Sequence, residues 1–251
     1  MKREDIQKAA ALLAKSRLEG RFLNELPLEA RPIAFTDAVA IQTETARVLG
    51  EKIVGYKVTG VQPETVTWGA ILASRLLAHP ATMPAASVPL LGVEAEIAYR
   101  LNIDLEARHR LLTLNEFDEI TTVIPAIEVV DTRFLSYLDA PLMDRNADFM
   151  SNGALIVADP WLSSEDTDFI KLPVTLERSG VTVVETVGGH PAVDPRLPAL
   201  AFFQSADRPD RVAAGTIITT GTYTGLNYFE PGDIVSASFS GYGTLEVSFT
   251  R

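Results

Sequence analysis

The sequence contains no cysteine among its 251 residues. This absence excludes disulfide bonds, thiolate metal sites, iron–sulfur clusters and a cysteine nucleophile. Positive charge is also scarce, since 22 lysines and arginines face 33 aspartates and glutamates, for a net charge of −11. A charge of this sign disfavours nucleic acid and anionic membranes as partners, because both are themselves negative. A small anionic ligand would need a local cation or a metal ion.

Long hydrophobic runs are missing as well. No stretch reaches the roughly 18 uninterrupted apolar residues of a membrane span. The first residues, Met1 to Asp5, lead into an amphipathic pattern and not into the apolar region of a signal peptide. We therefore expect a cytoplasmic protein. With 47% hydrophobic residues, a chain of this length is expected to bury a sizeable core.

The first fifty residues have the periodicity of helices. Apolar residues recur at helical spacing from Ile6 to Leu18, and the pattern stops at Gly20. A second helix is predicted from Thr36-Asp37 to Gly50. The sequence therefore predicts an N-terminal helical part over residues 1–50.

From Lys52 onward the apolar residues sit in short runs rich in valine, isoleucine, threonine and aromatics, which is typical of strands. The predicted strands are Ile53–Val58, Val93–Leu101, Val123–Val130, Ala154–Val157, Val174–Leu176, Val181–Thr186, Thr216–Thr220, Ile234–Phe239 and Leu245–Phe249. A short helix is predicted at Pro195–Gln204, and a hairpin turn at Ser179-Gly180. The fold class is therefore α+β, with the helical part packed on a β-rich body over residues 51–251 that forms one functional unit.

Three glutamates in predicted strands carry the main chemical signal. Glu94 and Glu96 are two residues apart, so a strand places both carboxylates on one face. Two like charges there are destabilising unless one is protonated or a cation lies between them. Glu128 interrupts the apolar run Val123–Val130, where an unpaired buried carboxylate would cost several kcal/mol.

One divalent cation bound by all three glutamates would explain the pattern. An all-carboxylate set favours Mg²⁺ or Mn²⁺ over the metals that prefer softer ligands. The alternative is that the Glu-x-Glu pair lies on the solvated face of an edge strand, as such pairs commonly do. The apolar neighbours of Glu128 favour the metal site.

Several segments resemble one known family in the same order along the chain. They are Gly55-Tyr56-Lys57-Val58-Thr59-Gly60, Val93–Ala98, Pro125–Arg133, Gly189-His190-Pro191, Gly215–Gly221 and Pro231-Gly232-Asp233. Together they are similar to the 2-keto-4-pentenoate hydratase and 4-oxalocrotonate decarboxylase family, part of the fumarylacetoacetate hydrolase superfamily. The resemblance implies a distorted β-sandwich or roll around a metal-bound active site, an N-terminal helical portion and a homo-oligomer.

The resemblance also implies roles for individual residues. It assigns Glu94, Glu96 and Glu128 to the Mg²⁺ or Mn²⁺, and Lys57 to the active site. On its own sequence context, Lys57 is better explained as a surface lysine with a buried stem.

Four further residues are candidates for substrate binding. Arg133 either clamps a substrate carboxylate or pairs with Asp131, and we favour the pair. His190 follows two glycines and either approaches the site or serves the structure. Gly221 and Thr222 match a turn beside the metal, where the backbone can approach a ligand.

The sequence departs from the family in two places. Ser74 stands where the family has an acid, and the stretch Met150–Ala154 is altered. Both departures concern proton transfer and leave the three glutamates in place. Asp144 or Asp148 could supply the missing carboxylate.

We therefore expect a metal-dependent lyase acting on a small 2-oxo acid, most simply a hydratase of the 2-keto-4-pentenoate type. The alternatives are a decarboxylase of the 4-oxalocrotonate type, a hydrolase that cleaves a carbon–carbon bond of an acylpyruvate, and a catalytically silent metal-binding or ligand-binding protein. The hydrolase would need a base to activate water, and the first histidine in the chain is only His79.

Overall fold

The computed structural model describes residues 1–106, 111–158 and 167–251. Its α-helices are α1 (Arg3–Glu19), α2 (Phe35–Leu49), α3 (Leu114–Ile120), α4 (Leu142–Ala147) and α5 (Arg196–Gln204). Its strands are β1 (Ile53–Thr59), β2 (Thr67–Leu72), β3 (Leu76–Ala78), β4 (Ala81–Pro84), β5 (Gly92–Leu101), β6 (Thr121–Val130), β7 (Asn152–Val157), β8 (Pro173–Arg178), β9 (Val181–Val187), β10 (Ile217–Thr222), β11 (Asn227–Tyr228), β12 (Ile234–Phe239) and β13 (Gly243–Thr250). Every helix and strand predicted from the sequence is present. The predictions missed α3, α4, β2, β3, β4 and β11.

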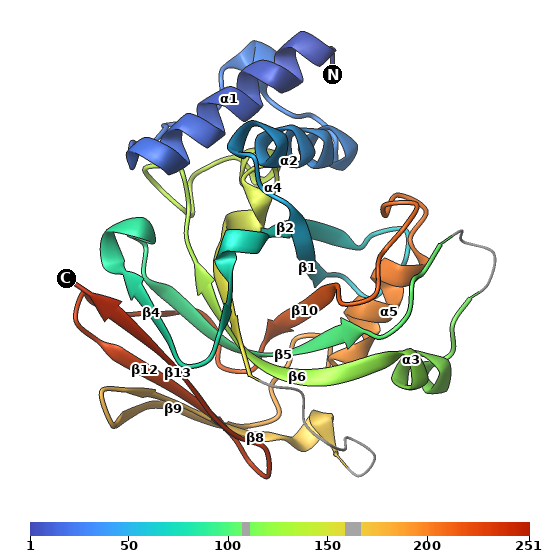
Figure 1. Cartoon of the computed structure of the whole chain (residues 1–251), viewed down its shortest axis with the longest axis vertical. Coiled ribbons are helices and arrows are strands. Elements are labelled where there is room, and N and C mark those ends of the chain that lie inside the picture. Colours follow the sequence, from blue (N-terminus) through green and yellow to red (C-terminus); the bar gives the residue numbers. More distant parts are fainter. Residues whose placement is uncertain (107–110, 159–166) are drawn as a thin grey trace.

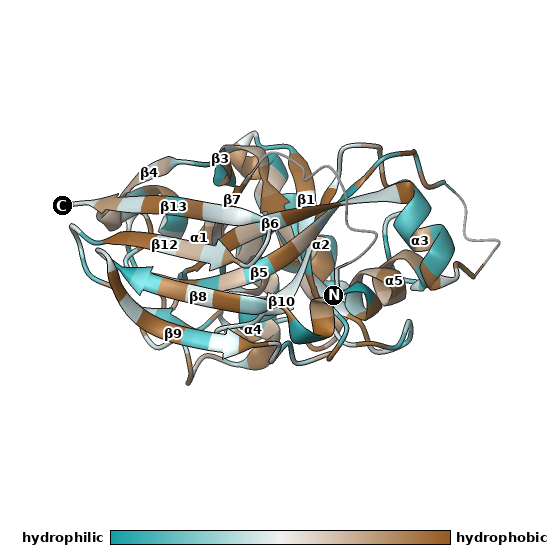
Figure 2. Cartoon of the chain, turned by 90° about the horizontal axis from the view of Figure 1, so that it is seen from below, coloured by the Kyte–Doolittle hydropathy of each residue, from teal (hydrophilic) through white to brown (hydrophobic). Residues whose placement is uncertain are grey.

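The strands form two sheets (Figure 1). The larger is curled and mixed, in the order β2-β1-β10-β5-β6-β7-β3, with β11 paired to β5. The second has the order β4-β13-β12-β8-β9, and Figure 2 shows these five strands side by side. The predicted α+β class, with helices beside a β-sandwich or roll, is confirmed.

The main core lies between the two sheets, because successive side chains of the central strands point to opposite faces and one of these faces is apolar. On β5, the residues at odd positions, Val93 to Leu101, are fully buried and pack with the apolar face of the second sheet. The residues at even positions point to the opposite face of the larger sheet, because side chains alternate along a strand. This face carries the glutamates.

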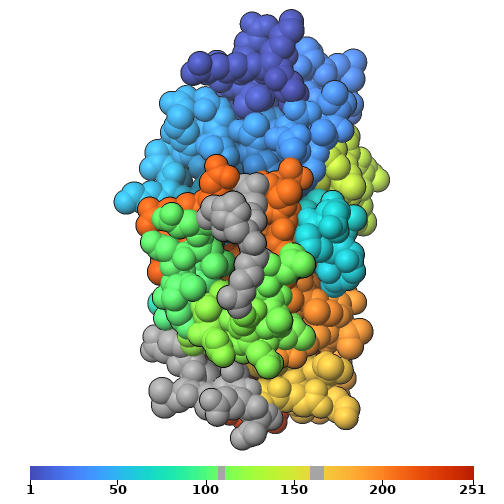
Figure 3. All heavy atoms as spheres, turned by 90° about the vertical axis from the view of Figure 1, so that its right-hand side faces the viewer, coloured from blue at the N-terminus to red at the C-terminus, as the bar shows by residue number. Residues whose placement is uncertain are grey.

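The N-terminal helices cover one end of the molecule (Figure 3). Helices α1 and α2 pack together around Leu13 and Ile41 and end at Gly20 and Gly50, as the sequence predicts. Gln42 of α2 links this part to the body. Its side-chain nitrogen donates to the carbonyls of Trp68 and Asn146, and its oxygen accepts from the Ala70 amide. α2 thereby fixes both β2 and α4.

None of the helices in the described residues combines the length and the apolar character needed to cross a bilayer.

Candidate metal centre and active site

Neighbouring strands place the three glutamates together. β5 and β6 pair antiparallel with Glu94 directly opposite Glu128, and Glu96 follows two residues later on the same face. One carboxylate oxygen from each residue lies within 4.8 Å of the other two. Glu96 and Glu128 are buried, with 1% and 0% of their surface exposed. The edge-strand alternative does not hold, because β5 and β6 lie in the interior of the sheet.

The raised pKa values of two of the glutamates indicate that the cluster is suited to a cation. Burial raises the pKa of Glu94 to about 7, although the nearby Lys57 opposes the shift. Burial, followed by the charges of Glu128 and Glu94, raises the pKa of Glu96 well above its ordinary value. Glu94 and Glu96 thus resist ionisation unless positive charge is supplied. The residues fit a hard divalent cation such as Mg²⁺ or Mn²⁺, which takes carboxylate ligands and keeps further positions for water or substrate.

Lys57 is the cation that the protein itself supplies. It lies on β1, and its Nζ is 2.8 Å from Glu128 Oε2. Its side chain is 17% exposed, so the surface-lysine alternative is wrong. Burial alone would lower the pKa of Lys57, but the charges of Glu128, Glu94 and Glu96 outweigh it and raise that pKa above its ordinary value. Lys57 is therefore protonated and held at the edge of the carboxylate cluster.

Uncharged donors hold the carboxylates in position. Asn152 Nδ2 donates to Glu128 Oε1 at 2.9 Å. The Thr219 hydroxyl and, at 3.4 Å, the Gly221 amide donate to Glu96 Oε2. These bonds orient the carboxylates, as groups around metal ligands commonly do. Asn152 belongs to the stretch in which the sequence departs from the family, so that departure does reach the metal site, contrary to expectation.

A pocket of about 260 Å³ opens onto the cluster. Lys57, Glu94 and Glu96 line it, together with Gly221 and Thr222 as predicted. Gly221 has a φ of 112°, a conformation that L side chains rarely adopt, so glycine is needed where this backbone meets the pocket.

The opposite wall of the pocket was not predicted. It comes from α4 and the turns on either side of it, and it includes Tyr137, Arg145 and Met150. The Arg145 guanidinium lies over the Tyr137 ring at 5.7 Å from the centroid, and its buried Nε has no hydrogen-bond partner. Among the described residues Arg145 forms no ion pair, so the pocket holds a second cation available to a ligand.

His190 lies behind the wall of the pocket. It is buried, its Nε2 is 3.0 Å from the Thr220 carbonyl, and its Nδ1 accepts from the Ala192 amide. This pattern corresponds to a neutral ring with the proton on Nε2, and burial lowers the His190 pKa. Its neighbour Pro191 lines the pocket instead. The structure therefore places His190 against the backbone and not in the lining of the pocket.

The structure does not bring Arg133 to the glutamates. Arg133 pairs with Asp131, the alternative that the sequence favoured, and both residues line a different pocket.

The candidate substitutes for the missing acid also lie elsewhere. Ser74 is exposed, and its amide donates to Glu51. Asp144 is buried and accepts from the Leu26 amide. Asp148 accepts from the Arg133 amide and pairs with Arg17. None of the three lines the glutamate pocket, so the expectation that Asp144 or Asp148 supplies a catalytic carboxylate is not supported.

Comparison with known proteins agrees with this geometry. Residues 64–250 match the family model described as fumarylacetoacetate (FAA) hydrolase C-terminal. The chain belongs to this family. The family resemblance predicted from the sequence is confirmed.

Within the fumarylacetoacetate hydrolase family, two curated relatives span almost the whole chain. A 4-oxalocrotonate decarboxylase from Pseudomonas putida is 26% identical over 265 residues, covering 99% of this chain and 98% of its own. A 2-keto-4-pentenoate hydratase from Burkholderia vietnamiensis is 28% identical over 262 residues, covering 98% of each. The identities are too low and too similar to separate the two reactions.

The fold of this family member matches a solved structure throughout. The 4-oxalocrotonate decarboxylase of Pseudomonas putida G7, complexed with magnesium and adipate, superposes with a TM-score of 0.85 and 23% identity, covering 99% of this chain and 98% of the other. At this identity the match establishes the fold. The chain is thus a fumarylacetoacetate hydrolase family protein, similar to lyases, with a three-glutamate cluster suited to a divalent metal.

Proposed function

We propose that the protein is a divalent-metal-dependent lyase of short 2-oxo acids and that its substrate carries a second carboxylate. The observation that supports it is the cluster of Glu94, Glu96 and Glu128 with Lys57 at its edge, in a pocket that also holds Arg145. The pocket volume, about 260 Å³, lies below the range of about 300–1,000 Å³ typical of drug-sized ligands, so it suits a substrate of a few carbon atoms.

Glu94, Glu96 and Glu128 would hold Mg²⁺ or Mn²⁺. When bound, the ion supplies charge stabilisation for the enolate of a 2-oxo acid. Lys57 would contact the same end of the substrate, where its ammonium binds a carboxylate or delivers a proton. The Gly221 turn allows the substrate to approach the backbone closely.

Arg145 would bind the second carboxylate, since a guanidinium matches a carboxylate with two parallel hydrogen bonds. A conjugated 2-oxo dicarboxylate bound this way can lose its distal carboxylate as CO₂. The carbon–carbon bond breaks, its electron pair enters the conjugated 2-oxo system to give a dienolate, and the dienolate oxygen takes a proton from water to form a 2-hydroxydienoate. This bond cleavage needs no acid from the protein. It suits a pocket in which, among the described residues, the only carboxylates in the lining belong to the glutamate cluster.

Hydration is the second candidate. It is favoured by the position of Lys57, because this protonated residue lines the pocket and can deliver the proton that the reaction needs. Here a 2-hydroxydienoate is protonated on carbon, and water then adds to the resulting conjugated ketone. Cleavage of an acylpyruvate by hydrolysis is not favoured. No histidine lines the described pocket, so a base for the attacking water is not evident.

The test is to supply 4-oxalocrotonate and 2-hydroxypenta-2,4-dienoate to the magnesium-loaded protein and to Arg145→Met. We expect turnover of the dicarboxylate with a KM that rises at least about tenfold in the variant, the scale of one charge-assisted hydrogen bond. Arg211→Met, which removes a 63%-exposed arginine that does not line the pocket, is the control. Faster turnover of the monocarboxylate, unaffected by Arg145→Met, would favour hydration. Metal binding with neither substrate converted would indicate a silent binder.

We also infer that the protein is a cytoplasmic homo-oligomer, on the strength of the family resemblance. Sedimentation of the purified chain tests the assembly: a monomer at micromolar concentration would contradict it.

A further inference from the structure

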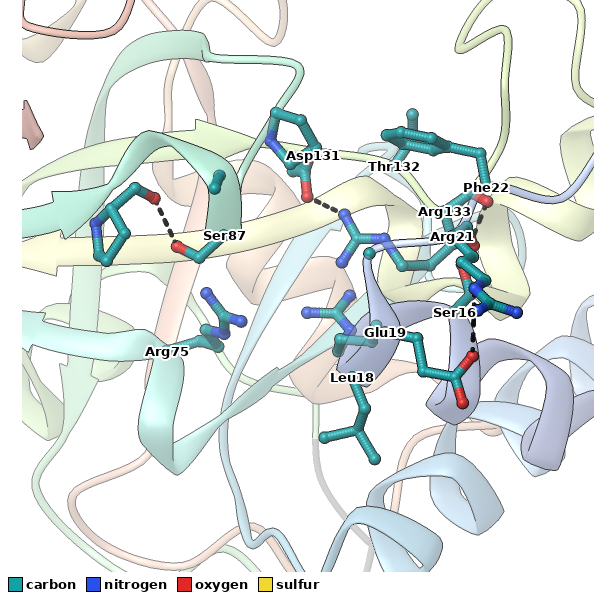
Figure 4. Close-up of a pocket in the computed structure, with 15 residues that line it drawn as sticks. Ser16, Leu18, Glu19, Arg21, Phe22, Arg75, Ser87, Asp131, Thr132 and Arg133 are labelled. Carbon is teal, nitrogen blue, oxygen red and sulfur yellow. Dashed lines mark hydrogen bonds and ion pairs between the residues drawn. The ribbon is translucent and has the colours of Figure 1, made fainter. Parts of the chain in front are cut away.

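A second pocket, of about 540 Å³, lies apart from the glutamate pocket and shares no lining residue with it (Figure 4). It lies between the end of α1, the turn after β2, the segment before β5 and the residues after β6. Four arginines line it, and three of them, Arg17, Arg75 and Arg133, come from distant parts of the chain. An arginine cluster is unexpected in a chain with a net charge of −11.

Acidic partners balance only part of this charge. Arg133 pairs with Asp131, and Arg17 Nη2 is 3.3 Å from Asp148 Oδ1. Arg75 forms no ion pair or hydrogen bond with the described residues. Arg21 and Glu19 also line the pocket, but they pair with each other at 3.6 Å. Of the four arginines, Arg75 alone forms no ion pair with the described residues, although the charge of Glu51 acts on it from outside the pocket lining.

The guanidinium group of Arg17 is held in place and keeps one donor without a partner. The Arg17 side chain is only 5% exposed, and its Nε has no hydrogen-bond partner. Its guanidinium lies over the Phe149 ring at 5.1 Å, which fixes its plane. Figure 4 shows Arg75 and Arg133 on either side of the pocket, with Ser87 beside it. The Ser87 hydroxyl donates to the Pro84 carbonyl.

The arginines also repel one another. Burial lowers the pKa of Arg133 to about 10, and the charges of Arg17 and Arg75 add to the shift although Asp148 opposes it. Burial and the charge of Arg17 lower the pKa of Arg75. An anion that lies between the arginines would stabilise them, because it reduces this repulsion between like charges.

We propose that the pocket lined by Arg17, Arg75 and Arg133 binds a small oxyanion, either a short carboxylate or a phosphate. A negatively charged ligand matches the one arginine that forms no ion pair, and paired oxygens match the guanidinium fork. The pocket volume falls within the range typical of small-molecule sites. The site is independent of the metal and of the proposed lyase reaction.

The test titrates succinate, and separately inorganic phosphate, into the full-length protein kept metal-free with a chelator at constant ionic strength. Each titration is repeated with Arg145→Met, which removes the unpaired cation of the glutamate pocket, so anion binding that survives this change belongs to the arginine pocket. Calorimetry reads the affinity, and the two titrations identify which chemistry the site prefers. The variants are Arg75→Gln, which removes an unpaired cation, and Ser87→Asp, which places a carboxylate in the pocket and leaves every arginine in place. Arg211→Gln is the control.

We expect at least one anion to bind the wild-type chain and the Arg211→Gln control with equal affinity. Binding should weaken by about tenfold or more in Arg75→Gln and in Ser87→Asp, the scale of one charge-assisted contact. Unfolding curves without ligand show whether each variant folds, and one folded variant suffices. Absence of binding by both anions, or equal binding in the folded variants, would overturn the proposal. So would a pocket covered by a second copy of the chain.

Discussion

The two pockets concentrate opposite charges by different means. The glutamate pocket draws its carboxylates from adjacent strands, β5 and β6, whose pairing fixes the side-chain positions. The arginine pocket draws its guanidinium groups from the end of α1, a turn after β2 and the residues following β6. The turn from Asp148 to Asn152 touches both, because Asp148 pairs with Arg17 and Asn152 donates to Glu128.

The difference shows how each kind of site tolerates its own charge. Carboxylates are short and held by strands, so they cannot move apart and must take up protons or a cation. Arginines are long, and two of these three reach carboxylates of the protein itself. The glutamate pocket therefore depends on a ligand for its charge balance much more than the arginine pocket does.

The first prediction removes a carboxylate from the glutamate pocket. Glu96→Gln keeps the volume of this buried side chain but removes its charge, so magnesium affinity should fall at least about 10²-fold and turnover should fall with it. Calorimetric titration of magnesium measures the affinity. Glu185→Gln, on the exposed edge of the second sheet, is the matched control. Unchanged affinity in Glu96→Gln would refute the assignment of the cluster to a metal.

The second prediction concerns the substitution of Lys57, the cation that pairs with Glu128. Lys57→Met preserves the apolar stem and should lower turnover by roughly 10²-fold or more, the scale of a lost acid–base group. It also leaves Glu128 without its ion-pair partner, so the metal-free variant should lose roughly 3 kcal/mol of unfolding free energy. Magnesium should restore most of that loss, because the ion supplies the missing positive charge. Wild-type turnover in Lys57→Met would contradict its role.

The third prediction concerns pH. The folded pKa of Glu94, about 7, is above the unfolded value of 4.5, and that of Glu96 is raised further in the same direction. Their contribution to stability is therefore fully present below pH 4.5 and is lost as the pH rises through the folded pKa values, by about 3 kcal/mol for Glu94 alone. Magnesium, which replaces the protons, should raise the melting temperature much more at pH 8 than at pH 5.

Thermal melts with and without magnesium at both pH values measure this effect. The lowered pKa of His190 gives stability that is lost as the pH falls below about 6.5. That contribution is present with and without the ion, so the magnesium-dependent difference isolates the carboxylates. An equal shift at pH 5 and pH 8 would show that the carboxylates do not exchange protons for the metal.

The smallest expected effect is that of Ser74→Asp. This change restores an acid where the family has one, but the exposed Ser74 lies next to Arg75, on the side of the arginine pocket. Hydration of 2-hydroxypenta-2,4-dienoate should stay within about twofold of the wild-type rate, and unfolding free energy within about 0.5 kcal/mol. A marked gain in hydration would show that this turn reaches the glutamate pocket.

The sequence predicted the glutamate pocket because regular strands translate spacing into position. Glu94 and Glu96 are two residues apart on a strand, and Glu128 interrupts an apolar run, so burial and a shared face followed directly. The family resemblance added Lys57, whose own context favoured a surface side chain.

The rest of the site depends on tertiary contacts that leave no periodic signal. Arg145 lies on α4, a helix of six residues that is too short for an amphipathic pattern, and α4 is joined to α2 by the hydrogen bond from Gln42 to the Asn146 carbonyl. β2 is a continuous apolar run without alternation, which short-range patterns do not assign. The arginine pocket joins Arg17 to Arg75 and Arg133 across 116 residues of sequence, and no local rule predicts such a meeting.

The pairing of Glu94 with Glu128 has a consequence for folding. If β5 slipped by one residue against β6, Glu94 and Glu96 would turn to the face that now packs on the second sheet, and Glu128 would face them no longer. The three carboxylates therefore meet only when these two ten-residue strands are correctly aligned. An ion that binds all three stabilises that alignment and no other, so the metal would act as a check on strand register before it takes part in any reaction.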